Sequence, residues 1–403
     1  MEKYDRQNDP QLIGYGLFSL VFRPPFALPD PYLSPDLRDA IEREPYRFIG
    51  LVTTHKHYRR KIRQSTELLK QLSLKHPDFS RLVVLPCALA HEDFCVLSDA
   101  CVQELVEKYH AVRKKVEYEE TWKQEQLIQM IYPYAGIPLA QFCKKPQGAP
   151  TWEKFCQGMV DIAAFLLSLH NEGYVHGDPS PNNLLYEQTD GKNGTFTIVD
   201  WNMLGKAESF LEHRKGYKRV GCWSPEHFSL TTVRLKEVEE DHHWMIYAEE
   251  MRKYMERLLN FSFSSGSSKG EKAIREYLGP HTGDHAAFQA MYADLKILAR
   301  TNPSAIGKYH DIRYFMDTIA KCVSYIFPNR TATQQNQYNF FISLCLVQNL
   351  PERKVYLDDP DRLANRLLVI LQACQNAERE RVPSHESIHP GLEAEQSLLN
   401  LLL

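Results

Sequence analysis

Apolar and polar residues alternate in short segments over the first 135 residues of the chain. A period of two is typical of strands that are buried on one face. Strands are expected at 12–23 (a pair joined by a tight turn), 47–53, 81–89, 94–99 and 127–134. Apolar residues recur at helical spacing over 57–74, and a Lys- and Glu-rich helix is expected over 103–123. Six prolines in residues 24–46 predict an irregular connection there.

Helical periods dominate the rest of the chain. A strongly apolar helix is expected over 152–170, ended by the glycine at 173, and helical patterns resume over 311–375. Short strands are expected at 174–176, 183–187 and 195–201, the last two joined by a hairpin with Asp-Gly and Asn-Gly turns. The Ser- and Gly-rich segment 261–272 is typical of a flexible insertion or linker.

The pattern therefore predicts an α+β protein in two parts. A strand-rich part occupies residues 1–135 and a helix-rich part occupies 136–375. We expect an insertion near 230–305 and a polar tail over 376–403.

Composition narrows the class of protein. The 403 residues carry a net charge of −3, and 43% of them are hydrophobic, which is ordinary for a globular protein. No apolar run is long enough for a membrane span, and the N-terminus has no apolar signal region, so we expect a soluble, intracellular, cytoplasmic protein. The nine cysteines form no C-x-x-C pair, which predicts reduced thiols rather than a zinc site or a disulfide framework.

The segment HGDPSPNN at 176–183, followed by IVDWN at 198–202, carries the strongest chemical signal. Phosphoryl transfer from ATP needs a carboxylate that orients the attacking hydroxyl and oxygen ligands that hold the metal ions. Asp178 fits the first role, and Asn183 and Asp200 fit the second, with Mg²⁺ or Mn²⁺ as the metal.

Two further motifs occur in a fixed order around these residues. The segment IGYGLFSLVF at 13–22 places Gly14 and Gly16 between two expected strands, where backbone amides can approach phosphates and Phe18 can cap the loop. The segment GCWSPEH at 221–227 contains Ser-Pro-Glu, which by itself would simply begin a helix.

In this order the three motifs resemble the eukaryotic-type protein kinase superfamily, as a divergent or atypical member. The likeness extends to kinases of large DNA viruses and to effector kinases of intracellular bacterial pathogens, which would act in the host cytoplasm. It implies a two-lobed kinase fold, with ATP between the lobes and a protein hydroxyl of Ser or Thr as acceptor. Val21 would then pack on the adenine, which would also meet the backbone of the hinge near Tyr132 and Tyr134.

The chain departs from the kinase pattern at the lysine that orients ATP. The strand at 47–53 has Gly50 or Leu51 at the expected place, and Arg23 is the candidate for a relocated cation, with Glu67 as the helix partner of such a cation. Loss of the lysine removes electrostatic stabilisation of the phosphates. A pseudokinase that serves as a nucleotide-binding scaffold is therefore one alternative. A small-molecule phosphotransferase of the aminoglycoside or choline type is another, because those enzymes share His-Gly-Asp followed by Asp-Trp.

The carboxylate that would anchor the catalytic loop from below stays open between Asp241 and Asp311. If Asp311 is the anchor, residues 230–305 are an insertion.

A dense group of cations lies in the helix expected over 57–74 and just before it. These residues are Lys56, Arg59, Arg60, Lys61 and Arg63. A solvated helix face is the simplest interpretation. The alternative is a site for a polyanion such as an inositol polyphosphate or an acidic lipid headgroup. The run lacks interleaved aromatic residues, which argues against nucleic acid as the partner.

Overall fold

The chain divides into two compact units, Met1–Gly136 and Ile137–Leu403. The computed structural model describes residues 10–15, 19–26, 33–87, 127–188, 194–210, 243–262, 285–346 and 355–376. Within these ranges the first unit is built on an antiparallel sheet and the second is mainly helical, which confirms the predicted α+β class.

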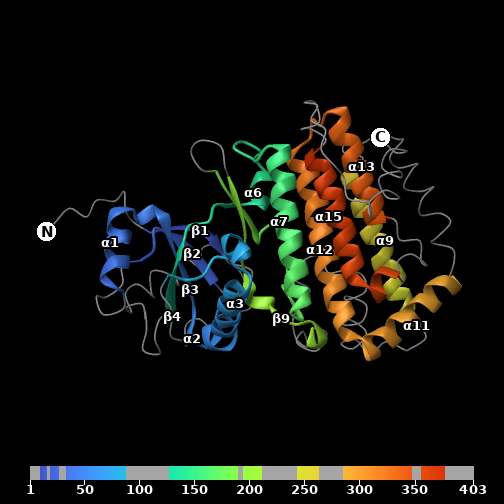
Figure 1. Ribbon diagram of the computed structural model, residues 1–403, viewed down its shortest axis with the longest axis horizontal. Helices are drawn as coiled ribbons and strands as arrows, with labels where there is room; N and C mark the ends of the chain where they lie inside the picture. Colours follow the sequence, from blue (N-terminus) through green and yellow to red (C-terminus); the bar gives the residue numbers. More distant parts are fainter. Residues whose placement is uncertain are drawn as a thin grey trace. The chain divides into compact units, whose positions relative to one another are not determined.

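Four antiparallel strands form the sheet of the first unit in the order of the sequence (Figure 1). They are β1 (Gln11–Tyr15), β2 (Ser19–Arg23), β3 (Phe48–Thr54) and β4 (Leu127–Pro133). Alternate residues face opposite sides of the sheet. On one side, Leu20, Phe22, Val52 and Leu127 form a buried cluster.

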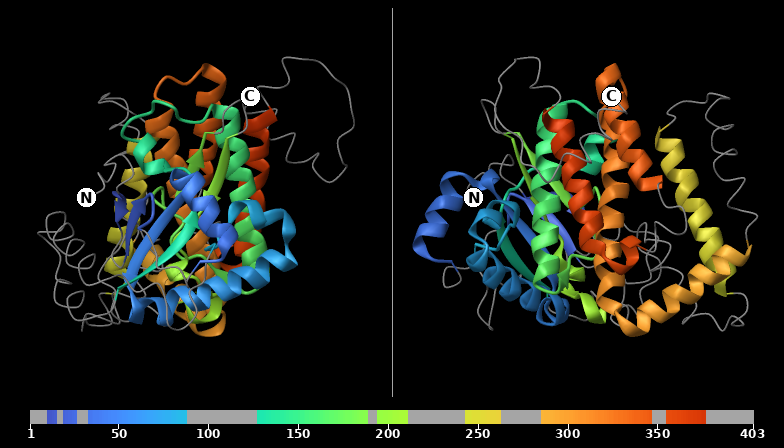
Figure 2. Two further views of the ribbon diagram at one scale, coloured as in Figure 1. Left: turned by 90° about the vertical axis from the view of Figure 1, so that its left-hand side faces the viewer. Right: turned by 45° about the vertical axis from the view of Figure 1, so that its right-hand side comes forward.

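A long helix covers the other side of the sheet. It comprises α2 (His55–His57), the π-helical turn η4 (Tyr58–Ile62) and α3 (Arg63–Lys75). The helix begins at Thr54, whose Oγ1 accepts a hydrogen bond from the backbone N–H of His57. Figure 2 shows this helix lying along the sheet. Its apolar residues Tyr58 and Ile62 pack against β4, while most of its cationic residues are exposed.

Two predictions for this unit are wrong. The proline-rich segment 24–46 contains the helix α1 (Pro35–Arg43), because Ser34 caps its N-terminus and Pro35 occupies a first-turn position where no backbone donor is needed. A short 3-10 turn, η3 (Pro45–Arg47), follows it. In the described part of the strand expected at 81–89, residues 81–82 end a 3-10 helix, η5 (Pro77–Leu82), and Val83 is a single bridge residue. The segments predicted at 94–99 and 103–123 lie outside the described residues.

Three long helices run side by side in the second unit (Figure 1). They are α7 (Trp152–Asn171), α12 (Pro303–Ile326) and α15 (Pro360–Asn376). Thr151 caps α7, and Gly173, with a φ of 80°, follows its end as the sequence predicts. Helix α12 has 19 buried residues, which makes it the core element of this unit.

Further helices pack around α12. They are α6 (Leu139–Phe142), α9 (His243–Ser262), α11 (His285–Thr301) and α13 (Ala332–Leu346). Figure 2 shows that α9 and α11 meet at one end of the helical layer. Both helices fall within the stretch 230–305, and their buried residues Tyr247, Tyr292 and Leu295 are part of the core. The segment predicted to be a flexible linker, 261–272, begins with two residues that belong to α9, and the rest lies outside the described residues.

Short strands complete the second unit. They are β5 (Ile137–Pro138), β6 (Tyr174–Val175), β7 (Leu184–Glu187), β8 (Thr195–Ile198) and β9 (Gly205–Lys206). Strands β7 and β8 pair antiparallel as the hairpin signals predict, and two 3-10 turns, η6 (Trp201–Met203) and η7 (Ala207–Ser209), follow. Within the described ranges, none of the helices combines the length and the apolar character that crossing a membrane requires.

Candidate functional site

Asp178 and Asn183 contact each other directly. The side-chain amide of Asn183 donates from Nδ2 to the backbone oxygen of Asp178 at 2.8 Å and to its carboxylate Oδ2 at 3.0 Å. One side-chain amide, that of Asn183, therefore joins the end of the loop between Val175 and Leu184 to its beginning. Asn183 is buried, whereas Asp178 is partly exposed.

Asp200 is tied to the same loop through its neighbour Val199. The backbone N–H of Val199 donates to the oxygen of Asn183 at 2.9 Å, and the oxygen of Val199 lies 3.1 Å from Nε2 of His176. Asp178 and Asn183 thus bond each other directly, and Asp200 is connected to them through the backbone of Val199.

The backbone at Asp200 is in the left-handed region, with φ of 63° and ψ of 66°. It has the only positive φ among the described residues other than glycine. Such a conformation is sparsely populated by residues with a Cβ, and it persists where the surroundings hold it. This conformation turns the backbone just after β8. The carboxylate of Asp200 is exposed, whereas the ring of the next residue, Trp201, is buried.

The two residues after Asp200 have different contacts: Trp201 packs in the core, and Asn202 holds the side chain of Asp200. Trp201 packs between Phe165 and His176, with ring centroids 5.7 and 4.5 Å away. The Nδ2 of Asn202 donates to Oδ1 of Asp200 at 2.6 Å. No pattern in the sequence predicts this amide contact.

Asp311 anchors the loop from helix α12. Its Oδ2 accepts from the backbone N–H of His176 at 2.8 Å, and its Oδ1 accepts from that of Gly177 at 2.7 Å. His170, near the end of α7, lies 3.1 Å from Oδ2 through its Nε2. Asp311 is fully buried, so these partners are what compensates its charge. The choice left open by the sequence is thus decided for Asp311 by contacts that span 135 residues, while Asp241 lies outside the described residues.

Burial shifts two ionisable groups of this network. Burial alone would raise the pKa of Asp311, but the hydrogen bond from His170 and the adjacent N–H groups outweigh it, so the pKa lies below its ordinary value. For His176, burial lowers the pKa more than the carboxylates of Asp311 and Asp200 raise it. The geometry agrees, because Nδ1 of His176 accepts the N–H of Asp178 and is therefore unprotonated.

Two more elements hold the loop in place. The hydroxyl of Thr318 on α12 donates to the oxygen of Pro179 at 2.8 Å, and the N–H of Ala140 on α6 donates to the oxygen of Pro181 at 2.9 Å. Neither contact has a local sequence signal, since the partners are far apart in the chain.

The predicted nucleotide-binding residues lie in the first unit. Gly14 and Val21 pair across the β1–β2 hairpin, while Gly16 and Phe18 at its tip lie outside the described residues. Tyr132 packs at the edge of the cluster beneath the long helix. Tyr134 follows β4, and its N–H donates to the oxygen of Arg47. Their role in binding adenine stays a prediction.

The strand β3 offers no cation on the face that it shares with Val21. Leu51 pairs directly with Val21, and Thr53 pairs with Ser19, so Leu51 and Thr53 occupy that face. Gly50 is on the other face and cannot stand in for the lysine. A Cβ at Gly50 would lie 2.0 Å from Oε1 of Gln129, whose amide bonds both the N–H and the oxygen of Phe26. Gly50 therefore makes room for a buried link between β4 and the chain after β2.

Arg23 is engaged at the end of β2 that is farther from the glycine loop. Its Nε donates to the oxygen of Tyr46 at 2.6 Å, and its guanidinium lies over the ring of Tyr134 at 3.5 Å. The role of Arg23 as the cation that binds phosphates stays a prediction. Glu67, its expected partner, is exposed and pairs with Lys70 at 3.6 Å.

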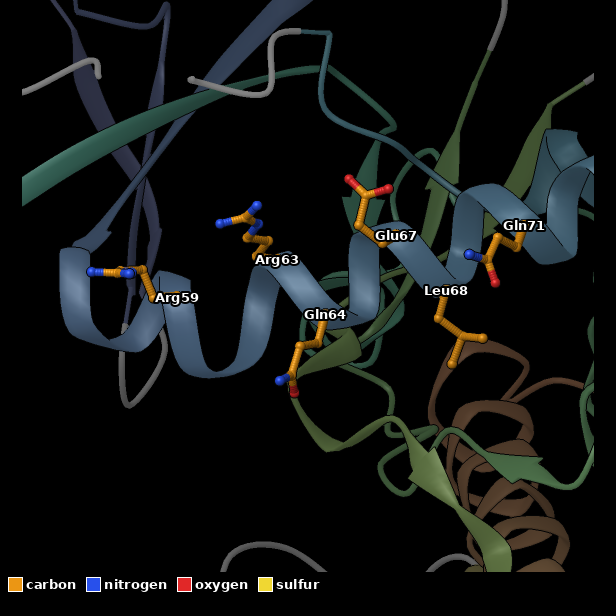
Figure 3. Close-up of a pocket in the computed structure, with 6 residues that line it drawn as sticks. All are labelled: Arg59, Arg63, Gln64, Glu67, Leu68 and Gln71. Carbon is orange, nitrogen blue, oxygen red and sulfur yellow. The ribbon is translucent and has the colours of Figure 1, made fainter. Parts of the chain in front are cut away.

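The cationic residues of the long helix line its solvent side. Lys56, Arg59, Arg60 and Arg63 are exposed, and Lys61 is half-buried. A hollow of about 540 Å³ borders the helix, with Arg59, Arg63, Gln64, Glu67, Leu68 and Gln71 among its walls. Figure 3 shows Arg63 and Glu67 on one side of the helix and Gln64 and Leu68 on another.

The donor set at the loop fits a hard divalent cation. Asn183 uses its Nδ2 toward Asp178, which leaves its amide oxygen for a metal, and Asp200 has an exposed carboxylate. Mg²⁺ and Mn²⁺ prefer such oxygen ligands. The described residues contain no group of three or more His, Cys, Asp or Glu side chains that could hold a metal ion. The proposed site differs from such a group, since an amide supplies one of its ligands.

No family model and no curated protein matches the chain.

Proposed function

We propose that this protein is an atypical protein kinase that transfers the γ-phosphate of ATP to a Ser or Thr hydroxyl. The observation that carries the proposal is the network in which Asp178, Asn183 and the segment before Asp200 are bonded together and anchored on Asp311. An ordinary turn does not need a buried carboxylate to hold two backbone N–H groups. This support is strongest for the catalytic loop of a two-lobed kinase fold.

In the proposed reaction each residue has one task. Asp178 orients the acceptor hydroxyl and takes its proton, and Asn183 keeps that carboxylate in place. Asn183 and Asp200 would hold Mg²⁺ or Mn²⁺, which supplies charge neutralisation at the phosphates. Asn202 positions the carboxylate of Asp200 through its side-chain amide.

One observation favours a second candidate, a pseudokinase that binds nucleotide without transferring phosphate. Leu51 and Thr53 occupy the face of β3 where a cation is expected, and Arg23 is engaged elsewhere. Without a cation, the phosphates lose an electrostatic contact that aligns them for transfer.

Transfer of labelled phosphate from ATP to the protein itself and to a generic basic protein tests both candidates. We expect Asp178→Ala to lower the rate by about 10²–10⁴-fold, the usual range for removal of a general base. Asp200→Ala and metal chelation should lower it to background. Asp358→Asn, which changes an exposed aspartate on another helix, should leave the rate unchanged.

The outcomes separate the candidates. Transfer that survives both Asp178→Ala and Asp200→Ala would refute the assignment of the site. A nucleotide-induced rise in melting temperature without transfer would establish the pseudokinase. Transfer to an aminoglycoside or choline but never to protein would establish a small-molecule phosphotransferase.

We also propose that the cationic helix of the first unit binds a polyanion, such as an inositol polyphosphate or an acidic lipid headgroup. Four exposed cations along two helical turns support it. The nearby carboxylate of Glu67 weakens the local field but is itself paired with Lys70.

A further inference from the structure

Two cysteines from distant parts of the sequence meet in the second unit. Cys143 follows α6, Cys322 lies in α12, and their Sγ atoms are 4.0 Å apart. Cys322 is fully buried, whereas Cys143 is partly exposed. The thiol of Cys143 is therefore accessible to a reagent from solvent, whereas the thiol of Cys322 is buried beside it.

The two thiols are chemically different. The hydrogen bond with Cys322 and the positive charge of Lys321 lower the pKa of Cys143, although its partial burial opposes this. Burial raises the pKa of Cys322. Because the thiolate is the reactive form, Cys143 is the thiol suited to attack and Cys322 the one suited to resolve.

The pair lies next to the supports of the loop 176–183. Cys322 is one helical turn beyond Thr318, whose hydroxyl bonds Pro179, and so is on the same face of α12. Cys143 is three residues beyond Ala140, whose N–H bonds Pro181. A covalent link between the cysteines would join the two elements that hold this loop.

We propose that Cys143 and Cys322 form a dithiol site that a peroxide closes to a disulfide, which ties α6 to α12. The Cys143 thiolate attacks one oxygen of the peroxide, forms an S–O bond and releases hydroxide, giving a sulfenic acid. The Cys322 sulfur then attacks the Cys143 sulfur, an S–S bond forms, and the hydroxyl leaves as water with the Cys322 proton. In total, two thiols are oxidised and one hydrogen peroxide is reduced to two waters. The sulfur atoms must approach from 4.0 Å to about 2.0 Å, the length of a disulfide bond.

The positions of the trypsin cleavage sites make a disulfide between Cys143 and Cys322 simple to detect. Trypsin releases Cys143 in the peptide 124–144 and Cys322 in the peptide 322–330, each with a single cysteine. The full-length protein is treated with hydrogen peroxide at a small molar excess, its remaining thiols are alkylated, and the digest is analysed by mass spectrometry. We expect a joined peptide, two hydrogens lighter than the sum of its parts, that disappears on reduction with dithiothreitol.

Variants test the order of the steps. In Cys322→Ser the joined peptide should be lost, and Cys143 should stop at a sulfenic acid that dimedone traps. Cys374→Ser, which changes another buried cysteine of this unit, should still give the joined peptide. Circular dichroism verifies that each variant is folded.

Other results would overturn the proposal, and the unaltered protein alone can give them. Recovery of both cysteines alkylated after peroxide treatment would exclude closure, as would recovery of Cys143 as a sulfinic acid with Cys322 alkylated. A dominant disulfide between Cys143 and any other cysteine would exclude this pairing. None of these readouts depends on phosphate transfer, so they test the disulfide independently of the proposed kinase activity.

Discussion

His176 links the parts of the candidate site and does so as a neutral ring. Its Nδ1 accepts the N–H of Asp178, its Nε2 bonds the oxygen of Val199, and its ring packs on Trp201. A proton on Nδ1 would face the N–H of Asp178, so protonation breaks the network. Burial acts in the same direction, and it outweighs the nearby carboxylates of Asp311 and Asp200, so the pKa is lowered.

The lowered pKa of His176 predicts that acid weakens the fold from about pH 6.5 downward, the ordinary pKa of histidine. Below that pH the unfolded chain binds a proton at His176 while the folded chain resists it, so the free energy of unfolding falls. The contribution is at most about 1.4 kcal/mol per pH unit.

Urea denaturation between pH 7 and 5 measures this effect of His176. The variant His176→Phe keeps a packed ring without a titrating group. It should be less stable at pH 7, because two backbone groups lose their partner, yet lose less stability on acidification. An equal pH slope in both proteins would contradict the role given to His176.

At the scale of elements, the close approach of Gln129 to Gly50 lets β4 bond to the chain that follows β2. Gln129 on β4 is fully buried, and its amide makes two hydrogen bonds of 2.9 Å to the backbone of Phe26. Only the absence of a side chain at Gly50 leaves room for this amide. The glycine at position 50 of β3, one of the two positions where the kinase pattern would place a lysine, thus has a packing cause.

Gly50→Ala should lower the free energy of unfolding by about 2 kcal/mol, because the new methyl group displaces an amide that loses both hydrogen bonds. Denaturant titration measures the change. Gly14→Ala is the matched control, since its Cβ would meet Val21 at an ordinary 3.7 Å. If the explanation holds, Gly50→Ala adds little cost in a chain that already carries Gln129→Ala. Fully additive costs would refute it.

These elements also show what could be predicted from the sequence. Period and capping predicted β3, β4 and α7 closely, because those signals lie within the element itself. The motifs around Asp178 and Asp200 were found for the same reason. The choice of Asp311, the link from Gly50 to Gln129 and the pair Cys143–Cys322 depend on residues that only folding brings together. Spacing along the chain contains no information about such contacts.

At the scale of the whole molecule, charge is distributed unevenly. The net charge of the chain is only −3, yet five cations lie within residues 56–63 on the helix of the first unit. The helix packs its apolar residues on the sheet, so the period that buries Tyr58 and Ile62 leaves four of these five cations exposed. The proposed long-range attraction to an anion would therefore come from this helix rather than from the total charge.

Isothermal titration of the full-length protein with inositol hexakisphosphate tests the polyanion site. We expect measurable heat, and an affinity that falls as salt is raised, because exposed charges are screened. Replacing Arg59, Arg60 and Lys61 by glutamine should weaken binding at least about tenfold, since each lost charge-assisted hydrogen bond contributes more than a kilocalorie. The control variant Lys144→Gln/Lys145→Gln removes two exposed cations of the second unit and should bind normally. Absence of heat, or equal affinity in the triple variant, would leave these residues as a solvated helix face.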